Sequence, residues 1–148
     1  MSDNSNMTDV GISYLAQGCS HLQSINILRI MLSADRCIIG MAAIGETCRG
    51  LTSIDMSYNS NMTDVCISYL AQGCIHLQSI NIGGSWSQLT DASLSGIGES
   101  CRGLTSIDMS YNSNMTDVGI SYLAQGCIHL QSINIGGSYS QLTDASLA

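Results

Sequence analysis

Apolar and polar residues alternate in short stretches that recur along the chain. In residues 77–82 the apolar positions are Leu77, Ile80 and Ile82, with polar residues between them. This alternation predicts a short β-strand with one buried face, because successive side chains of a strand point to opposite sides. A polar turn follows each such stretch, as in residues 58–61 and 83–88.

The stretch after each turn has helical periodicity. In residues 62–74 apolar residues recur at spacings of three and four, which predicts a helix whose apolar side faces the strand. Thr63 or Asp64 suits the N-cap, since a side-chain oxygen there accepts from the free amides of the first turn. Gly73 suits a left-handed residue that ends the helix. The apolar positions of this helix are Ile67, Leu70, Ala71 and Cys74.

This strand–helix pattern belongs to a sequence repeat. Residues 44–94 and 97–147 align without a gap over 51 positions and differ at three, and residues 1–27 match residues 56–82 with three differences. Cysteines 26, 27 and 26 residues apart divide each 53-residue unit into two related halves. Repetition at this period predicts a solenoid of stacked units. These cysteines are Cys48, Cys74, Cys101 and Cys127, and Cys19 precedes them.

The pattern Leu-x-x-Ile-x-Ile/Met, followed by Thr-Asp and then Leu-Ala-x-x-Cys, resembles the cysteine-containing class of leucine-rich repeats. The resemblance implies one α/β array over residues 1–148, a right-handed horseshoe arc of about five strand–helix units with its parallel sheet on the concave face. It is similar to the repeat domains of F-box ubiquitin-ligase subunits. No F-box-like helical segment precedes the repeats, so that role does not carry over.

Residues 28–43 break the pattern. They stand where the sequence of residues 83–96 is expected, with two residues more. Residues 29–39 can be encoded so that the second reading frame gives Gly-Ser-Cys-Ser-Gln-Leu-Thr-Asp-Ala-Ser-Leu, which differs from residues 84–94 at one position. We therefore interpret this segment as a copy of the repeat read out of frame, a hypothesis that the coding sequence tests directly. The expected consequence is a distorted or bulged unit, still apolar enough to cover the core.

Composition restricts the function. Hydrophobic residues make up 45% of the 148 and charged residues 10%, which favours a folded domain over disorder. A net charge of −7 with four Arg and no Lys argues against binding nucleic acid or anionic lipid. The polar first residues do not resemble a secretory signal, and no apolar stretch is long enough to span a membrane, so a cytoplasmic location is expected.

No candidate chemistry points to an enzyme, a cofactor or a metal site. The cysteines in register are interpreted as buried thiols that pack as small hydrophobic residues. Cys37 and Cys66 lie outside the register, and their reactivity is left open. His21, His76 and His129 each follow a cysteine by two residues and are interpreted as an exposed row rather than as metal ligands.

The polar side of the strands is expected to line the concave face. Asp55 and Asp108 should point outward there, among Asn and Ser at the matching positions of the other strands. Such a face can bind a polar ligand or weakly hold a cation. It contains no base, nucleophile or oxyanion arrangement, and it lacks the aromatic and Arg residues that dominate protein interfaces.

Neither end of the array has a distinct capping sequence, although solenoids usually need polar terminal units. Uncapped end strands present unpaired backbone, and a second copy of the chain can cover it. The sequence thus predicts a non-enzymatic interaction module that forms a homodimer or larger assembly through its ends. The alternative is a recognition domain for another protein, in the manner of ubiquitin-ligase adaptors. Candidate interface residues are Ser24, Ile25, Asn26, Ile27, Ser132, Ile133, Asn134 and Ile135 in end strands, and the aromatics Trp86 and Tyr139 in turns.

Overall fold

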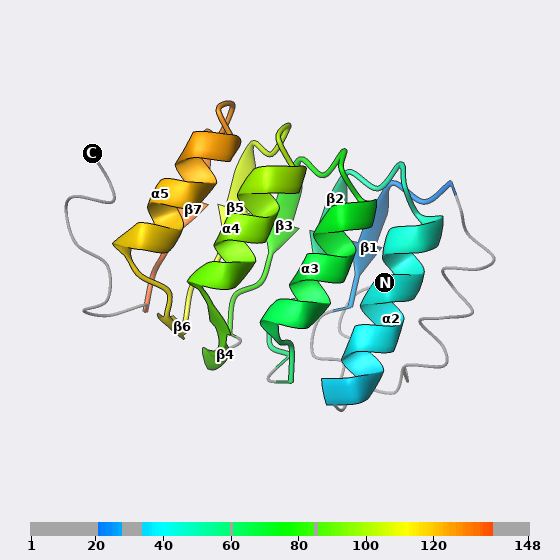
Figure 1. Ribbon diagram of the computed structural model, residues 1–148, viewed down its shortest axis with the longest axis horizontal. Coiled ribbons are helices and arrows are strands. Elements are labelled where there is room, and N and C mark those ends of the chain that lie inside the picture. Colours follow the sequence, from blue (N-terminus) through cyan, green and yellow to red (C-terminus); the bar gives the residue numbers. More distant parts are fainter. Residues whose placement is uncertain (1–20, 28–33, 60, 85, 138–148) are drawn as a thin grey trace.

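The computed structural model describes residues 21–27, 34–59, 61–84 and 86–137. Short strands and helices alternate along them (Figure 1). The helices are α2 (Ala34–Thr47), α3 (Asp64–Gly73), α4 (Asp91–Ser100) and α5 (Asp117–Gly126). The strands are β1 (Ser24–Asn26), β2 (Ser53–Asp55), β3 (Ser79–Asn81), β4 (Trp86–Thr90), β5 (Ser106–Asp108), β6 (Asn112–Asn114) and β7 (Ser132–Asn134).

Five of the strands form a parallel sheet in the order β1-β2-β3-β5-β7. The helices cover one face of this sheet, and successive units stack side by side (Figure 1). The middle residue of each strand is an isoleucine, and the five isoleucines pair in register across the sheet. The predicted α/β solenoid of the leucine-rich-repeat type is therefore confirmed.

The core between sheet and helices is aliphatic and contains the cysteines in register. Cys48, Cys74, Cys101 and Cys127 are buried free thiols, as predicted, and Cys19 lies outside the described residues. Each thiol also bonds to the unit before it, since the Cys74 Sγ donates to the Cys48 carbonyl over 3.4 Å. The same bond recurs from Cys101 to Cys74 and from Cys127 to Cys101. This cysteine ladder adds a hydrogen bond between neighbouring units at a carbonyl that already accepts from the backbone three residues later, as the Cys48 carbonyl accepts from the Leu51 N–H over 3.1 Å.

A second ladder consists of buried asparagines in the turns. The Asn112 side-chain amide donates to the carbonyls of Ile82, Met109 and Ser110 over 3.0, 3.0 and 3.2 Å. Asn59 makes the equivalent bonds one repeat earlier. Each asparagine thus connects its own turn to the preceding strand end. Its Oδ1 is buried and has no hydrogen-bond partner in the part of the chain that the structure describes.

Aspartates at the helix starts connect neighbouring helices. The N-caps are Thr63, Thr90 and Thr116, which confirms the predicted helix starts. Asp91 accepts from the Thr116 backbone N–H over 2.7 Å and from its hydroxyl over 2.5 Å. Asp64 binds Thr90 in the same way and also accepts from Ser93. These aspartates therefore do more than the predicted capping, because each orients the N-cap of the next helix.

Replacing Asp91 by alanine is expected to lower the free energy of unfolding by about 2 kcal/mol, because two charge-assisted bonds between units are lost. Urea unfolding followed by circular dichroism measures the change. Glu99→Ala is the control, because it removes a carboxylate that lines a hollow on the same helix, and a smaller loss is expected for it. Equal, near-zero effects in both variants would contradict the role assigned to Asp91.

One predicted feature of the helices is wrong. Gly73 does not end α3 in a left-handed conformation, because the described glycines with positive φ are Gly84 and Gly137. Gly73 instead faces Gly45 of α2, where an added Cβ would overlap the Gly45 backbone. The expected distortion of residues 28–43 stays a prediction: residues 34–43 lie in α2, which has 14 residues against 10 in each of α3, α4 and α5. The rest of that segment, residues 28–33, lies outside the described residues.

The predicted turn at residues 83–88 is only partly a turn. Trp86 begins strand β4, which pairs in parallel with β6 beside the helix starts. The alternation of apolar and polar residues in these two segments was too weak to predict this two-stranded sheet. Within the described residues, no helix is long and apolar enough to cross a membrane.

Candidate interaction surfaces

The sheet face opposite the helices carries the predicted row of Ser, Asn and Asp. Asp55 and Asp108 are partly exposed there. The Asp108 Oδ1 accepts from the backbone N–H and the hydroxyl of Ser110 over 3.0 and 2.7 Å. Asp55 binds Ser57 in the same way. These carboxylates are therefore held by their own turns, which fixes their orientation and occupies part of their capacity as acceptors.

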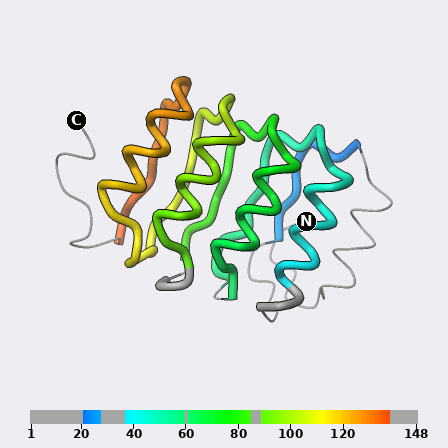
Figure 2. The backbone as a smooth tube through the Cα atoms, viewed as in Figure 1, coloured from blue at the N-terminus to red at the C-terminus, as the bar shows by residue number. Residues whose placement is uncertain are grey.

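The two outer strands of the sheet differ in burial. They lie at opposite ends of the array (Figure 2). In β1 and directly after it, Ile25 is 3% exposed and Ile27 is fully buried. In β7 and directly after it, Ile133 and Ile135 remain partly exposed. The polar residues predicted with them are mostly exposed, namely Ser24, Ser132 and Asn134, whereas Asn26 is intermediate.

Within the described residues, the backbone of β7 pairs with another strand on one side only. The Ser132 N–H donates to the carbonyl of Thr105, just before β5, and the Asn134 carbonyl accepts from the N–H of Met109, just after β5. Since successive residues of a strand direct their backbone groups to opposite sides, the Ile133 N–H and carbonyl point away from β5. No strand within the described residues pairs with that side.

Two aromatic residues of the turns, Tyr58 and Tyr111, pack against the next unit and are also partly exposed. Tyr58 and Tyr111 have φ values of 59° and 56°, and 44% and 41% of their surfaces are exposed. Tyr58 lies against Gly84 and Tyr111 against Gly137, so an added Cβ on either glycine would meet the ring at 2.6 or 2.5 Å. Each ring thus covers the next unit. Tyr139 lies outside the described residues, as does the side chain of Trp86.

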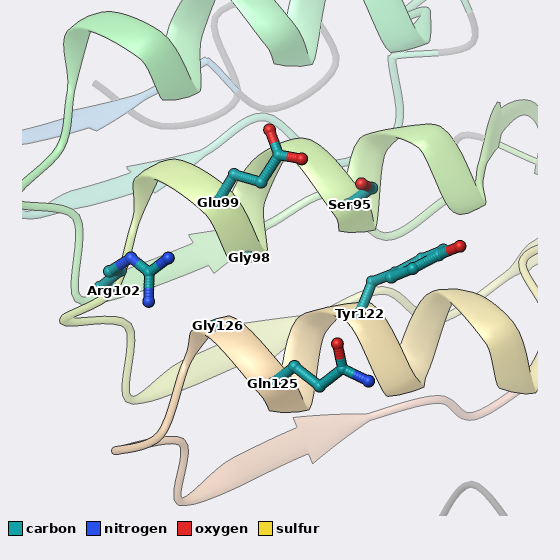
Figure 3. A pocket seen from close by; sticks show the side chains of 7 residues that line it. All are labelled: Ser95, Gly98, Glu99, Arg102, Tyr122, Gln125 and Gly126. Carbon is teal, nitrogen blue, oxygen red and sulfur yellow. The ribbon is translucent and has the colours of Figure 1, made fainter.

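Among the hollows on the helix side, two are equivalent by the repeat, and the sequence reasoning missed them. One lies between α4 and α5 and has a volume of about 410 Å³ (Figure 3). The other lies between α2 and α3, with about 320 Å³. Both lie over a contact between two glycines and have Glu, Arg, Tyr and Gln at their rims. The residues of the larger hollow are Ser95, Gly98, Glu99, Arg102, Tyr122, Gln125 and Gly126.

The three predicted surface histidines cannot all serve as ligands of one metal ion. His21, His76 and His129 are exposed, as the interpretation of an exposed row requires. Among the described residues, no three His, Cys, Asp or Glu side chains come close enough to hold a metal ion. Burial raises the pKa of the Cys74 and Cys101 thiols to about 12, so these two thiols are protonated at neutral pH.

The two cysteines outside the ladder differ from the others and contact each other. Cys37 on α2 and Cys66 on α3 are both buried. A hydrogen bond from Cys37 lowers the pKa of Cys66 to about 6, and the Thr63 hydroxyl, 3.3 Å from the Cys66 sulfur, contributes to the same effect. The hydrogen bond to Cys66, followed by burial, raises the pKa of Cys37. The sequence indicated only that both lie off the register.

Comparison with known proteins agrees with the fold. A family model described as Leucine Rich repeat matches residues 100–124. A chain in the crystal structure of the yeast Rad7 and Elc1 complex superimposes with a TM-score of 0.82 at 17% identity, over 98% of this chain. This chain spans 36% of that chain's length. The tropomodulin C-terminal domain of Caenorhabditis elegans gives a TM-score of 0.63 at 14% identity, over 84% of this chain and 80% of that one.

Proposed function

We propose that this protein is a non-enzymatic protein–protein interaction module of the cysteine-containing leucine-rich-repeat class, and that it binds a second copy of itself through an end of the array. The observation that carries the proposal is the outer side of β7, where the Ile133 backbone N–H and carbonyl point away from the sheet. An unpaired edge of this kind is a template for another strand.

Apolar surface at the same end supports the proposal. The inner isoleucines Ile54, Ile80 and Ile107 are 1–2% exposed. Ile133 and Ile135 are only partly buried, and Ile128, just before β7, is 74% exposed. A second copy that pairs its own β7 with this strand buries these side chains and satisfies the backbone. Two identical edges related by a twofold axis form a closed, antiparallel contact.

Light scattering after size exclusion tests the proposal over a wide range of protein concentration. The expected result is a discrete species with twice the mass of one chain. Ile133→Pro removes the outward N–H without removing a hydrogen bond to β5, so it is expected to give a monomer with unchanged circular dichroism.

The matched control is Ser24→Pro, at the outward position of β1. If two β7 strands pair, Ser24→Pro leaves the dimer intact. If β7 pairs with β1 of the next copy, both variants lose association, and the wild type forms a series of larger species rather than one dimer. A wild-type chain that is monomeric at every concentration would contradict self-association.

A second candidate is recognition of another protein through the helices. It is favoured by two identical pairs of exposed side chains, Val65 with Tyr69 on α3 and Val118 with Tyr122 on α5. All four are between 46% and 55% exposed, which is high for apolar residues one helical turn apart. A photo-crosslinking residue at position 69 is expected to label a partner that the same residue at position 24 does not label. Equal labelling at both positions would contradict this candidate.

A further inference from the structure

The contact between Cys37 and Cys66 joins the first turns of two neighbouring helices. Cys37 is the fourth residue of α2, and Cys66 is the third residue of α3. The Cys37 thiol is 3.3 Å from the Met62 Sδ, just before α3, and the largest effect on the pKa of Cys37 and of Cys66 comes from the other thiol. Two thiols from different helices thus meet in a pocket of sulfur atoms that excludes water.

The surroundings of Cys66 favour its thiolate form. The hydrogen bond from Cys37 lowers the pKa of Cys66 most, and burial opposes it. The Thr63 hydroxyl, 3.3 Å from the sulfur, and backbone N–H groups of the first helical turn also stabilise the negative charge. The resulting pKa of about 6 leaves Cys66 largely deprotonated at neutral pH. The ladder cysteines Cys74 and Cys101 have pKa values of about 12 and stay protonated. Cys66 is therefore the strongest nucleophile among these thiols.

The repeat itself does not require this pair. The position that matches Cys66 in the next 53-residue copy is Gly119, whose added Cβ would meet Leu94 and Asp91 of α4. The space at Cys66 exists because α2 differs from α4 in sequence at its start. The pair is thus a local feature of α2 and α3. The other described units of the array stack without such a pair.

We propose that Cys37 and Cys66 form an oxidation site, at which a hydroperoxide such as hydrogen peroxide converts the two thiols into a disulfide that joins α2 and α3. The Cys66 thiolate attacks a peroxide oxygen, the O–O bond breaks, and hydroxide leaves, so that the sulfur becomes a sulfenic acid. Cys37 then gives up its proton and attacks the Cys66 sulfur, and the S–O bond breaks. Overall, two thiols and one hydrogen peroxide yield one disulfide and two water molecules.

Access to the buried pair depends on local opening. Both cysteines lie in the first turns of their helices, and helix ends open more readily than helix centres. Hydrogen peroxide is small enough to enter through such an opening. Once formed, the disulfide closes a loop from Cys37 to Cys66 and restricts the unfolded chain, so the urea midpoint of the oxidised protein is expected to rise.

Thiol mapping of the full chain tests the proposal. Reduced protein is treated with hydrogen peroxide, unfolded, labelled with N-ethylmaleimide and digested for mass spectrometry. The expected product has five labelled cysteines of the seven and a linked peptide pair containing Cys37 and Cys66. We expect Cys66 to lose its thiol at least about tenfold faster than Cys74 or Cys101, because reactivity follows the thiolate fraction.

Single-residue variants distinguish Cys66, which attacks the peroxide, from Cys37, which then forms the disulfide. Cys37→Ser is expected to stop the reaction at a Cys66 sulfenic acid, which dimedone captures, whereas Cys66→Ser leaves Cys37 unmodified. Cys101→Ala, in the cysteine ladder, is the control and leaves the linked pair unchanged. The proposal is overturned if the ladder cysteines react as fast as Cys66, or if the wild type forms only intermolecular disulfides. It is also overturned if the folded chain stays reduced while the urea-unfolded chain oxidises.

Discussion

Replacing Gly126 by alanine is expected to destabilise the array by about 3 kcal/mol or more, since the new methyl group would overlap backbone atoms that have no room to move. Gly126 is the last residue of α5, and an added Cβ there would collide with the carbonyl group and Cα of Gly98 in α4. The contact is between two main chains, so no side-chain rotation relieves it. Relief requires the two helices to separate, which exposes the core beneath them.

Glycine–glycine contacts explain why the helices pack in two close pairs, α2 with α3 and α4 with α5. Gly45 and Gly73 bring α2 and α3 together in the way that Gly98 and Gly126 bring α4 and α5 together. At the matching position of α3 the residue is Ala71, and α3 and α4 pack less closely than the other two neighbouring pairs. The presence or absence of a methyl group therefore gives the solenoid its 53-residue alternation of close and wider helix contacts.

Alanine substitutions at two glycines of α4 provide the measurement and its control. Gly98→Ala would place a Cβ 2.6 Å from the Tyr122 carbonyl oxygen, whereas an added Cβ on Gly96 meets nothing within 4 Å. In urea unfolding followed by circular dichroism, we expect Gly126→Ala and Gly98→Ala to lose stability. Gly96→Ala should gain up to about 1 kcal/mol, because alanine favours the helix over glycine. A gain in stability for Gly126→Ala would contradict the close contact.

The features that follow from local periodicity were predictable from the sequence. Alternating apolar residues located the strands, and Thr followed by Asp located the helix starts, because both signals lie within one unit. The recurrence of cysteine every 26 or 27 residues likewise indicated buried thiols. These signals determine which residues of a unit face its core, and the structure agrees with them.

The features that depend on which residues of neighbouring units meet were not predictable. Gly73 was interpreted as a helix terminator, since no local signal indicates that it faces Gly45 of the preceding helix. Asp64 was expected to cap its own helix, although it binds Thr90 of the next. The hollows over the glycine contacts arise in the same way. Self-association through β7 stays a prediction, because it depends on a second chain.

The second large effect concerns the buried asparagine ladder. Replacing Asn112 by aspartate keeps the shape of the side chain, but removes both amide hydrogens and places an oxygen against three carbonyl oxygens. Asn112 is fully buried, so water cannot screen the new charge. We expect a loss of about 3–5 kcal/mol at neutral pH, the range found for an uncompensated buried charge.

The pH dependence of Asn112→Asp distinguishes charge from loss of hydrogen bonds. Burial and the facing carbonyls favour the protonated carboxyl, so the pKa of the new aspartate in the folded chain is expected to lie above its unfolded value of about 3.9. The folded state then binds the extra proton more tightly, and the penalty of the variant relative to the wild type shrinks as pH falls through the folded pKa. The protonated carboxyl also donates one of the lost bonds.

The measurement is urea unfolding of the wild type, Asn112→Asp and Asn112→Ala at several pH values between neutral and mildly acidic. Asn112→Ala removes the donors without adding a charge, so its penalty relative to the wild type should stay constant with pH. The penalty of Asn112→Asp should be the larger of the two at neutral pH and should approach that of Asn112→Ala on acidification. A penalty for Asn112→Asp that stays constant over this range would mean that the carboxylate reaches water, and that the turn between β5 and β6 opens to let it do so.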